Sequence, residues 1–140
     1  MFCDGGARGN PGPAGIGAVV VDPTVDPPES LASVSESIGV ATNNVAEYKA
    51  LIAALVAAEP FCARRIEVRA DSKLVIEQVA GRWKVKQAHL EPLRAEVRAL
   101  LARYDEVDLR HIPRADNADA DALANAAMDA AAAAVPRPGW

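Results

Sequence analysis

The stretch that decides the fold is DGGARGNPGPAGIGAVVVD, residues 4–22. Ala18 to Asp22 (AVVVD) is typical of a buried strand, because a short apolar run bounded by turn residues fits the inside of a sheet. Asp4 ends a short apolar start and opens a glycine-rich turn. Two strands joined by this turn therefore begin the chain, and an acidic residue lies where the first strand ends.

The residues that follow continue the sheet and then leave it. A proline-rich segment, residues 23–28, breaks the chain into a loop. Residues 31–41 (LASVSESIGVA) alternate apolar and polar side chains, as a half-buried strand does. Residues 42–44 (Thr-Asn-Asn) then offer caps for a helix that ends before Pro60. Its apolar stripe consists of Tyr48, Leu51, Ile52, Leu55 and Val56.

The second half of the chain alternates helices and strands. Residues 66–70 and 107–112 are expected strands, and residues 74–80, 90–104 and 117–136 are expected helices. Strands that alternate with helices need crossover connections and therefore pair in parallel. The sequence predicts an α/β fold with a mixed five-stranded sheet, three antiparallel strands followed by parallel ones, flanked by helices.

Length and composition are those of a compact globular domain. The 140 residues fit one domain, and a hydrophobic content of 51% argues against disorder. We expect the domain to span residues 1–135 and residues 136–140 to form a tail. No apolar run reaches the roughly 18 residues that a membrane span needs, and no secretory signal begins the chain. We therefore expect a cytoplasmic protein that does not contact a membrane.

The cysteines and the net charge narrow the function only slightly. Cys3 and Cys62 are too few for a disulfide framework, and we expect two buried thiols, with a single bridge between them left open. The net charge of −4 disfavours a nucleic-acid binder, because phosphate contacts usually require a basic surface. Bound cations would reverse the local field if acidic residues hold metal.

Four carboxylates lie at boundaries of the expected elements: Asp4, Glu47, Asp71 and Asp121. If the fold brings them together, divalent cations are the usual way to neutralise their repulsion, and carboxylate oxygens suit Mg²⁺ or Mn²⁺. An acidic site with two metals is suited to phosphodiester chemistry. The alternative for each acid is a solvated charge or a helix cap, and it is strongest for Asp121, which other aspartates precede.

Four segments carry further motifs, in this order: DGGARGNPGPAGIGAVV (4–20), TNNVAEYKAL (42–51), ADSKLVIEQV (70–79) and ADADALANAAM (118–128). Together they resemble ribonuclease H of type 1 over essentially the whole chain. The resemblance implies the same mixed sheet and a metal-dependent endonuclease that cuts the RNA strand of RNA–DNA hybrids, leaving 5′-phosphate and 3′-hydroxyl ends. It assigns Asp4, Glu47, Asp71 and Asp121 as ligands of two cations, Mg²⁺ or Mn²⁺, with Asp4 best placed to bridge them.

The same resemblance implies contacts to both strands of a hybrid. Asn10, Asn43 and Asn44 match positions that touch the RNA strand in the minor groove, where 2′-hydroxyls donate and accept hydrogen bonds. The alternative is that Asn43 and Asn44 only cap a helix and Asn10 only shapes a turn. Thr42 matches a threonine that binds a DNA phosphate, with a plain strand-end residue as the alternative.

One segment, GRWKVK (81–86), is the clearest basic and aromatic cluster in the chain. A ring facing a sugar or base, together with phosphate contacts, suits a groove for the DNA strand. We therefore expect Trp83 and Lys84 to bind substrate. The alternative is a solvated loop with Trp83 packed against the core.

The chain departs from the family's pattern in three places. Only three residues precede Asp4, so we expect a shortened first strand and reduced stability. The chain passes from the helix after Asp71 almost directly into the next helix, so it resembles the short form that lacks a basic protrusion and should bind substrate more weakly. The loop at 112–120 lacks the histidine of many members. His111 falls inside a strand, and we expect Arg114 to contact the scissile phosphate or to aid product release.

Three other functions stay open. One is cleavage of RNA duplexes as well as hybrids, since both have accessible minor grooves. Another is a module that binds a hybrid or an RNA duplex without catalysis. The third is an accessory domain that is active only within a longer protein. The presence of all four carboxylates favours an active enzyme, which we expect to be a monomer.

Overall fold

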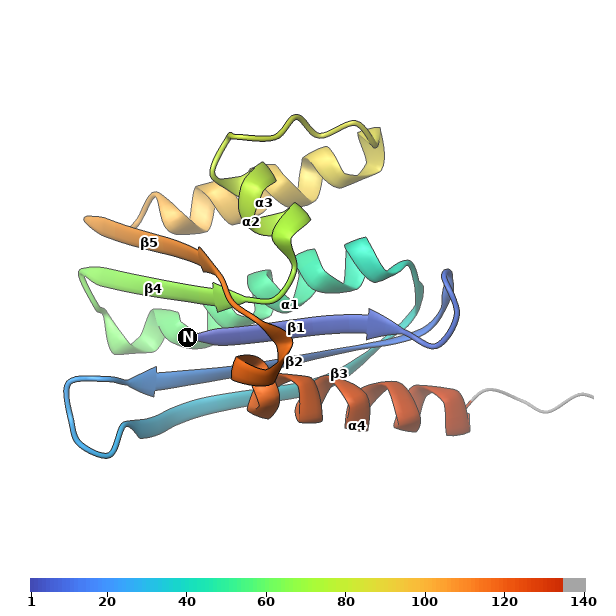
Figure 1. Ribbon diagram of the computed structural model, residues 1–140, viewed down its shortest axis with the longest axis horizontal. Helices are drawn as coiled ribbons and strands as arrows, with labels where there is room; N and C mark the ends of the chain where they lie inside the picture. Colours follow the sequence, from blue (N-terminus) through green and yellow to red (C-terminus); the bar gives the residue numbers. More distant parts are fainter. Residues whose placement is uncertain (135–140) are drawn as a thin grey trace, which may run out of the picture.

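Figure 1 shows the computed structural model, which describes residues 1–134. Its strands and helices follow one another in the predicted order. They are β1 Phe2–Ala7, β2 Gly12–Asp22, β3 Glu29–Ala41, α1 Asn43–Ala58, β4 Arg65–Ala70, α2 Lys73–Val79, α3 Glu91–Leu101, β5 Glu106–His111 and α4 Ala118–Ala134. Short 3₁₀ turns precede β4, α3 and α4. The predicted tail at 136–140 lies outside the described residues.

The five strands form one sheet in the order β3-β2-β1-β4-β5. β1, β2 and β3 are antiparallel neighbours, whereas β4 pairs in parallel with both β1 and β5. The predicted α/β class, with three antiparallel strands followed by parallel ones, is therefore confirmed.

Helices cover both faces of this sheet. Successive strand residues point to opposite faces. A Cβ atom on Gly5 would meet Ala46 of α1, whereas a Cβ atom on Gly6 would meet Met128 of α4. The helices α1 and α4 therefore lie on opposite faces, as Figure 1 shows, and α2 and α3 pack on the side of α1.

The main core lies between the sheet and α1. Leu51 and Leu55 of α1 are fully buried, and burial of a leucine side chain contributes about 1.5–3 kcal/mol. Tyr48 is also fully buried, and its hydroxyl donates a 2.6 Å hydrogen bond to Oε1 of Gln78 in α2. The leucines of α1 thus pack this helix against the strands, and the Tyr48 hydrogen bond ties α2 to it.

On the other face, α4 lies close to the sheet because β2 has glycines beneath it. A Cβ atom on Gly17 would be 2.3 Å from the carbonyl oxygen of Ala120, and one on Gly15 would be 2.5 Å from the backbone nitrogen of Met128. Real side chains do not tolerate such distances. These two glycines therefore set the depth at which α4, and the acidic residue near its start, sits on the sheet.

Two predicted strand boundaries are wrong. β1 continues to Ala7 and β2 begins at Gly12, so Asp4 lies inside a strand rather than at its end. The antiparallel register explains the difference, because Asp4 pairs with Gly17 and the ladder continues until Ala7 pairs with Ala14. Glycine has a low intrinsic preference for strands, so the local sequence hides a pairing that tertiary contacts impose.

The prediction for the cysteines is only half right. Cys3 is buried and Cys62 is exposed, and both are free thiols, so no bridge joins them. Cys62 follows a 3₁₀ turn and adopts a left-handed conformation with φ of 51°. The predicted burial of Cys62 is wrong because this residue lies in a surface turn between α1 and β4.

The connection between α2 and α3 is short and tightly held. Nε of Arg94 donates to the carbonyl of Gln78 at 2.8 Å, and Nη1 of Arg98 donates to that of Val79 at 3.0 Å. These bonds tie α3 to the end of α2, where the last carbonyls of a helix have no partners in a following turn. The carbonyl of Gln78 also accepts from the backbone nitrogen of Gly81 at 3.1 Å. Only residues 80–90 separate the two helices, so this connection contains no long basic protrusion, as the resemblance to the short form implies.

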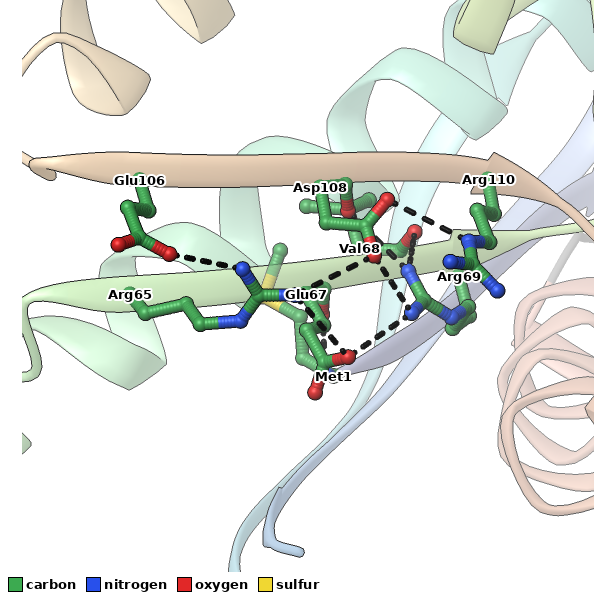
Figure 2. A network of polar contacts seen from close by, with 8 residues as sticks. All are labelled: Met1, Arg65, Glu67, Val68, Arg69, Glu106, Asp108 and Arg110. Carbon is green, nitrogen blue, oxygen red and sulfur yellow. Dashed lines mark hydrogen bonds and ion pairs between the residues drawn. The ribbon is translucent and has the colours of Figure 1, made fainter.

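The face of the sheet on which α4 packs continues over β4 and β5, where charged side chains instead of a helix cover it (Figure 2). Arg65 of β4 pairs with Glu106 of β5 at 2.8 Å, and Arg69 pairs with Asp108 at 3.2 Å.

Within residues 1–134, no helix combines the length and the apolar character that crossing a membrane requires.

Candidate active site

The sheet brings two of the four carboxylates together. β1 and β4 are parallel, and Cys3 pairs with Ala70. Asp4 follows the first of these residues and Asp71 follows the second, so the two acidic side chains emerge next to each other where β4 ends. β1 continues beyond this point, which leaves Asp4 inside β1 at the end of the parallel ladder.

The helices supply the other two carboxylates. Glu47 lies in the first turns of α1, directly after Ala46, whose carbonyl is in close contact with Gly5 of β1. Asp121 lies in the first turn of α4. Nδ2 of Asn117, just before α4, donates a 2.9 Å hydrogen bond to the carbonyl of Cys3 and ties the start of that helix to β1.

All four carboxylates line one pocket of about 310 Å³. The complete lining is Asp4, Gly5, Gly6, Ala7, Arg8, Asn43, Glu47, Asp71, Arg114, Asp121, Asn125 and Met128. The pocket is therefore assembled from β1, α1, α4 and the segments after β4 and β5. Of the predicted site residues, it contains the four acids, Arg114 and Asn43.

Crowding of these acids shifts their protonation. Burial raises the pKa of Asp4 to about 8, and the neighbouring charges of Asp71 and Asp121 add to the effect. Burial also raises the pKa of Glu47 to about 6, although a hydrogen bond from Ser72 acts in the opposite direction. Ionised carboxylates are thus unfavourable in this pocket, and a bound cation would offset the cost of their negative charge.

The donor set fits a hard divalent cation, because it consists of carboxylate oxygens from four separate chain segments. Asp121 has a cationic partner already, since Nη2 of Arg114 lies 3.1 Å from its Oδ1. Within residues 1–134, no group of three or more acidic, histidine or cysteine side chains is already arranged to hold a metal ion. The chemistry of the pocket therefore supports cation binding by these carboxylates.

Two of the three predicted RNA-contacting residues, Asn10 and Asn43, are connected by a hydrogen bond, and Asn43 lines the pocket. Oδ1 of Asn10 accepts a 3.1 Å hydrogen bond from the backbone nitrogen of Asn43, and Oδ1 of Asn43 accepts a 2.9 Å bond from that of Ala7. Asn44 is half-buried at the second position of α1. Thr42 caps α1 by accepting a bond from Val45. The cap of α1 is therefore Thr42, so Asn43 and Asn44 do not cap the helix, and Thr42 is more than a plain strand-end residue. The side chain of Asn10 contacts the start of α1 rather than its own turn.

The predicted contacts to the DNA strand lie outside the pocket. Trp83 is 43% exposed, which excludes the alternative that it is packed into the core. Nζ of Lys73 lies 5.8 Å from the centre of its ring, within the range of a cation–π interaction. Lys84 is exposed beside it. The cluster therefore also includes Lys73, which lies outside the GRWKVK segment.

Three other residues near the acids were missed. Asn117 is buried, and Arg8 and Asn125 line the pocket. Asn125 lies one helical turn after Asp121 and could have been found from that spacing. The sequence contained no signal for the other two, because their roles depend on contacts across more than 100 residues. His111 is exposed at the end of β5, as expected for a strand residue.

Comparisons with known proteins agree with this geometry. The family described as reverse transcriptase-like matches residues 2–127. The crystal structure of RNase H1 from Halobacterium salinarum superimposes with a TM-score of 0.86 and 47% identity, covering 93% of this chain and 96% of that one. This chain belongs to the ribonuclease H type 1 family.

Two further relatives of the type 1 family are informative. LC11-RNase H1, solved in complex with an RNA/DNA hybrid, has a TM-score of 0.85 and 43% identity over 94% of this chain and 96% of that one. The bifunctional protein Rv2228c of Mycobacterium tuberculosis is 53% identical over 92% of this chain but only 35% of its own length. The chain thus spans about a third of the length of that relative.

Proposed function

We propose that this chain hydrolyses the RNA strand of RNA–DNA hybrids as an endonuclease, leaving 5′-phosphate and 3′-hydroxyl ends. One observation carries the proposal: four carboxylates from β1, α1, α4 and the end of β4 line a single pocket in a type 1 ribonuclease H domain. A related domain that this chain covers almost completely was solved in complex with an RNA/DNA hybrid.

We assign Asp4, Glu47, Asp71 and Asp121 as the ligands of two divalent cations, Mg²⁺ or Mn²⁺. When bound, two such cations would activate the attacking water and stabilise the leaving 3′ oxygen. Asp4 is the best bridging ligand, because its carboxylate has two acidic neighbours: Asp71, just after β4, and Asp121 in α4. Arg114 would contact the scissile phosphate, which its 3.1 Å hydrogen bond to Asp121 in the pocket supports.

The polar rim would recognise the hybrid. Asn10, Asn43 and Asn44 would face the 2′-hydroxyls of the RNA strand, since amide groups both donate and accept. Thr42 would contact a DNA phosphate, and Trp83 with Lys84 would lie along the DNA strand. All four carboxylates come from one chain, which favours a monomeric enzyme, and we place its activity in the cytoplasm.

Strand-specific cleavage tests this function. A hybrid labelled on either strand, a single-stranded RNA and an RNA duplex are incubated with the chain and Mg²⁺ or Mn²⁺. We expect cuts only in RNA, dependence on the added cation, and 3′-hydroxyl ends that a polymerase can extend. Cleavage of the DNA strand, or cuts of equal rate in single-stranded RNA, would contradict the proposal. Equal rates on hybrid and RNA duplex would broaden the substrate class.

A further inference from the structure

Arg8 is a basic residue of the pocket that the proposed reaction has not used. It lies in the turn between β1 and β2, two residues before Asn10, and its side chain is 48% exposed. Besides Arg114, it is the other cationic residue that lines the pocket with the four acids. Arg114 is paired with Asp121, so the two arginines sit in different electrostatic settings.

The side chain of Arg8 is held against α4. Nη2 of Arg8 donates to Oδ1 of Asp129 at 2.8 Å and to Oδ1 of Asn125 at 3.3 Å. Nδ2 of Asn125 in turn donates to the backbone carbonyl of Asp121 at 2.9 Å. A chain of hydrogen bonds therefore connects the guanidinium of Arg8 to the helical turn that carries an active-site carboxylate.

The backbone of this turn is also fixed. The backbone nitrogen of Arg8 donates a 2.8 Å hydrogen bond to the carbonyl of Pro13. A Cβ atom on Gly12 would lie 2.0 Å from the carbonyl oxygen of Arg8, so the turn closes tightly around it. Gly9 has a φ of 93°, a left-handed conformation that favours glycine. The backbone of Arg8 is therefore held in place beside the pocket, while its side chain is held by the bonds to α4.

The guanidinium keeps donors free for a ligand. An arginine has five N–H donors, and both bonds of Arg8 within residues 1–134 come from Nη2. Its ion-pair partner, Asp129, is 69% exposed, and pairs of this kind contribute only about 0–1 kcal/mol. A phosphate can therefore bind the remaining fork, or replace Asp129, at little cost. Such bidentate contacts are characteristic of arginine with phosphate.

We propose that Arg8 binds a backbone phosphate of the RNA strand next to the scissile phosphodiester, and so positions that strand in the pocket. This inference rests on the proposed function. The RNA strand is assigned rather than the DNA strand, because Arg8 shares its turn with Asn10 and lies beside Asn43, whereas Trp83 and Lys84 lie outside the pocket. Arg8 is a substrate-binding residue here and takes no part in moving a proton.

Arg65 provides a matched control. It is 51% exposed and pairs with Glu106 at 2.8 Å, close to the 48% and 2.8 Å of Arg8 with Asp129. It lies at the start of β4, while Asp71 follows the end of that strand, so the strand separates it from the pocket by roughly 20 Å. Replacing either arginine removes one positive charge, but only Arg8 is placed to meet the RNA.

The test measures hybrid binding and cleavage by Arg8→Ala, Arg8→Lys and Arg65→Ala at several salt concentrations. Binding is measured in an Asp71→Asn background, so that the substrate stays intact. We expect Arg8→Ala to raise Kd and KM about five- to tenfold, with a smaller change in kcat, and to lower the slope of log Kd against log salt by about one, as loss of one phosphate contact does. Arg8→Lys should restore the slope, since it keeps the charge, and Arg65→Ala should match the parent.

A second substrate identifies the strand. In a hybrid whose DNA strand carries uncharged methylphosphonate linkages opposite the cut site, the loss caused by Arg8→Ala should persist. Disappearance of that loss would assign the contact to DNA and overturn the inference. A salt slope that is equal for Arg8→Ala and Arg65→Ala would also overturn it, while cleavage by the parent chain would leave the proposed function standing. Failure of the parent to cut or bind any hybrid would reject the proposed function itself.

Discussion

Asn117 and Cys3 are joined by a 2.9 Å hydrogen bond, from the side-chain Nδ2 of the first to the backbone carbonyl of the second, across 114 positions of sequence. The bond is buried. Asp4 is the next residue after Cys3, and Asp121 lies one helical turn after Asn117. Together with the close packing of α4 on Gly15 and Gly17, this amide sets the spacing of the strand and the helix that carry two of the proposed metal ligands.

We predict that Asn117→Ala weakens both stability and metal binding. The change leaves a buried carbonyl without its donor, which costs about 1–3 kcal/mol in free energy of unfolding. It also frees the start of α4, so the rise in Tm on adding Mn²⁺ should shrink. Thermal melting with and without Mn²⁺ measures both effects. Asp116→Ala, an exposed neighbour, is the control and should change neither. An unaltered Mn²⁺ response in a destabilised Asn117→Ala would contradict the positioning role.

The two glycines of β2 give a second prediction. Gly17→Ala would place a Cβ atom 2.3 Å from the carbonyl oxygen of Ala120, so α4 must shift outward, at about 1–3 kcal/mol. Cleavage should fall with stability, because Asp121 moves with the helix. Gly39→Ala is a useful contrast: it meets no atom within 4 Å, and only its φ of 79° costs about 1–2 kcal/mol.

The comparison is made at a temperature where both variants are folded. Gly17→Ala should then be the slower enzyme, and Gly39→Ala should cut at the parent's rate. Equal rates for the two glycine variants would show that the depth of α4 does not control the site.

The raised pKa of Asp4 predicts a pH-dependent instability of the metal-free protein. The pKa of Asp4 is about 8 in the folded chain and about 3.8 as a free side chain. Between these values the folded state binds more protons than the unfolded state, so stability falls as pH rises towards 8. Asp4→Asn removes this penalty. In EDTA it should raise Tm at pH 8 and change it much less at pH 5, as measured by melting curves, while Asp116→Asn should shift neither.

The addition of cation should reverse the order of stability at pH 8. The parent should then melt at a higher temperature than in EDTA, because the cation favours the ionised form of Asp4, whereas Asp4→Asn should respond weakly. A parent that is as stable at pH 8 as at pH 5 in EDTA would refute the crowding of these carboxylates.

Arg114 and His111 are predicted to differ in importance for turnover. Nη2 of Arg114 lies 3.1 Å from Asp121 in the pocket, whereas His111 ends β5 and does not line it. Arg114→Ala should lower kcat by about tenfold or more, the effect of losing one charge-assisted contact, and His111→Ala should lower it less. Single-turnover and steady-state rates on a labelled hybrid measure the two. Equal or reversed losses would reject the assignment.

Much of the fold was predictable because its signals are local. Residues 42–44 were expected to supply the cap of the first helix, and Thr42 accepts the capping bond in the structure. The alternation of apolar and polar side chains predicted β3, and the apolar stripe predicted α1. The four carboxylates could be proposed for the same reason, since each belongs to a short motif that is complete in its own segment.

What the sequence did not predict depends on long-range pairing. The end of β1 was missed because the residues after Asp4 are mostly glycine, and only the register with β2 makes them a strand. The exposure of Cys62 depends on a turn between elements. The hydrogen bond from Arg8 to Asp129 joins residues more than 100 positions apart, so no local pattern could have suggested it.

Cleavage and binding by the Asp71→Asn variant test the central claim most directly. The purified chain and this variant are compared on an RNA-labelled hybrid with Mg²⁺ or Mn²⁺, and hybrid binding is measured for both. We predict metal-dependent cutting by the parent, no cutting by the variant, and binding retained in both. A variant that cuts the hybrid as fast as the parent would contradict the assignment of these carboxylates as the active site.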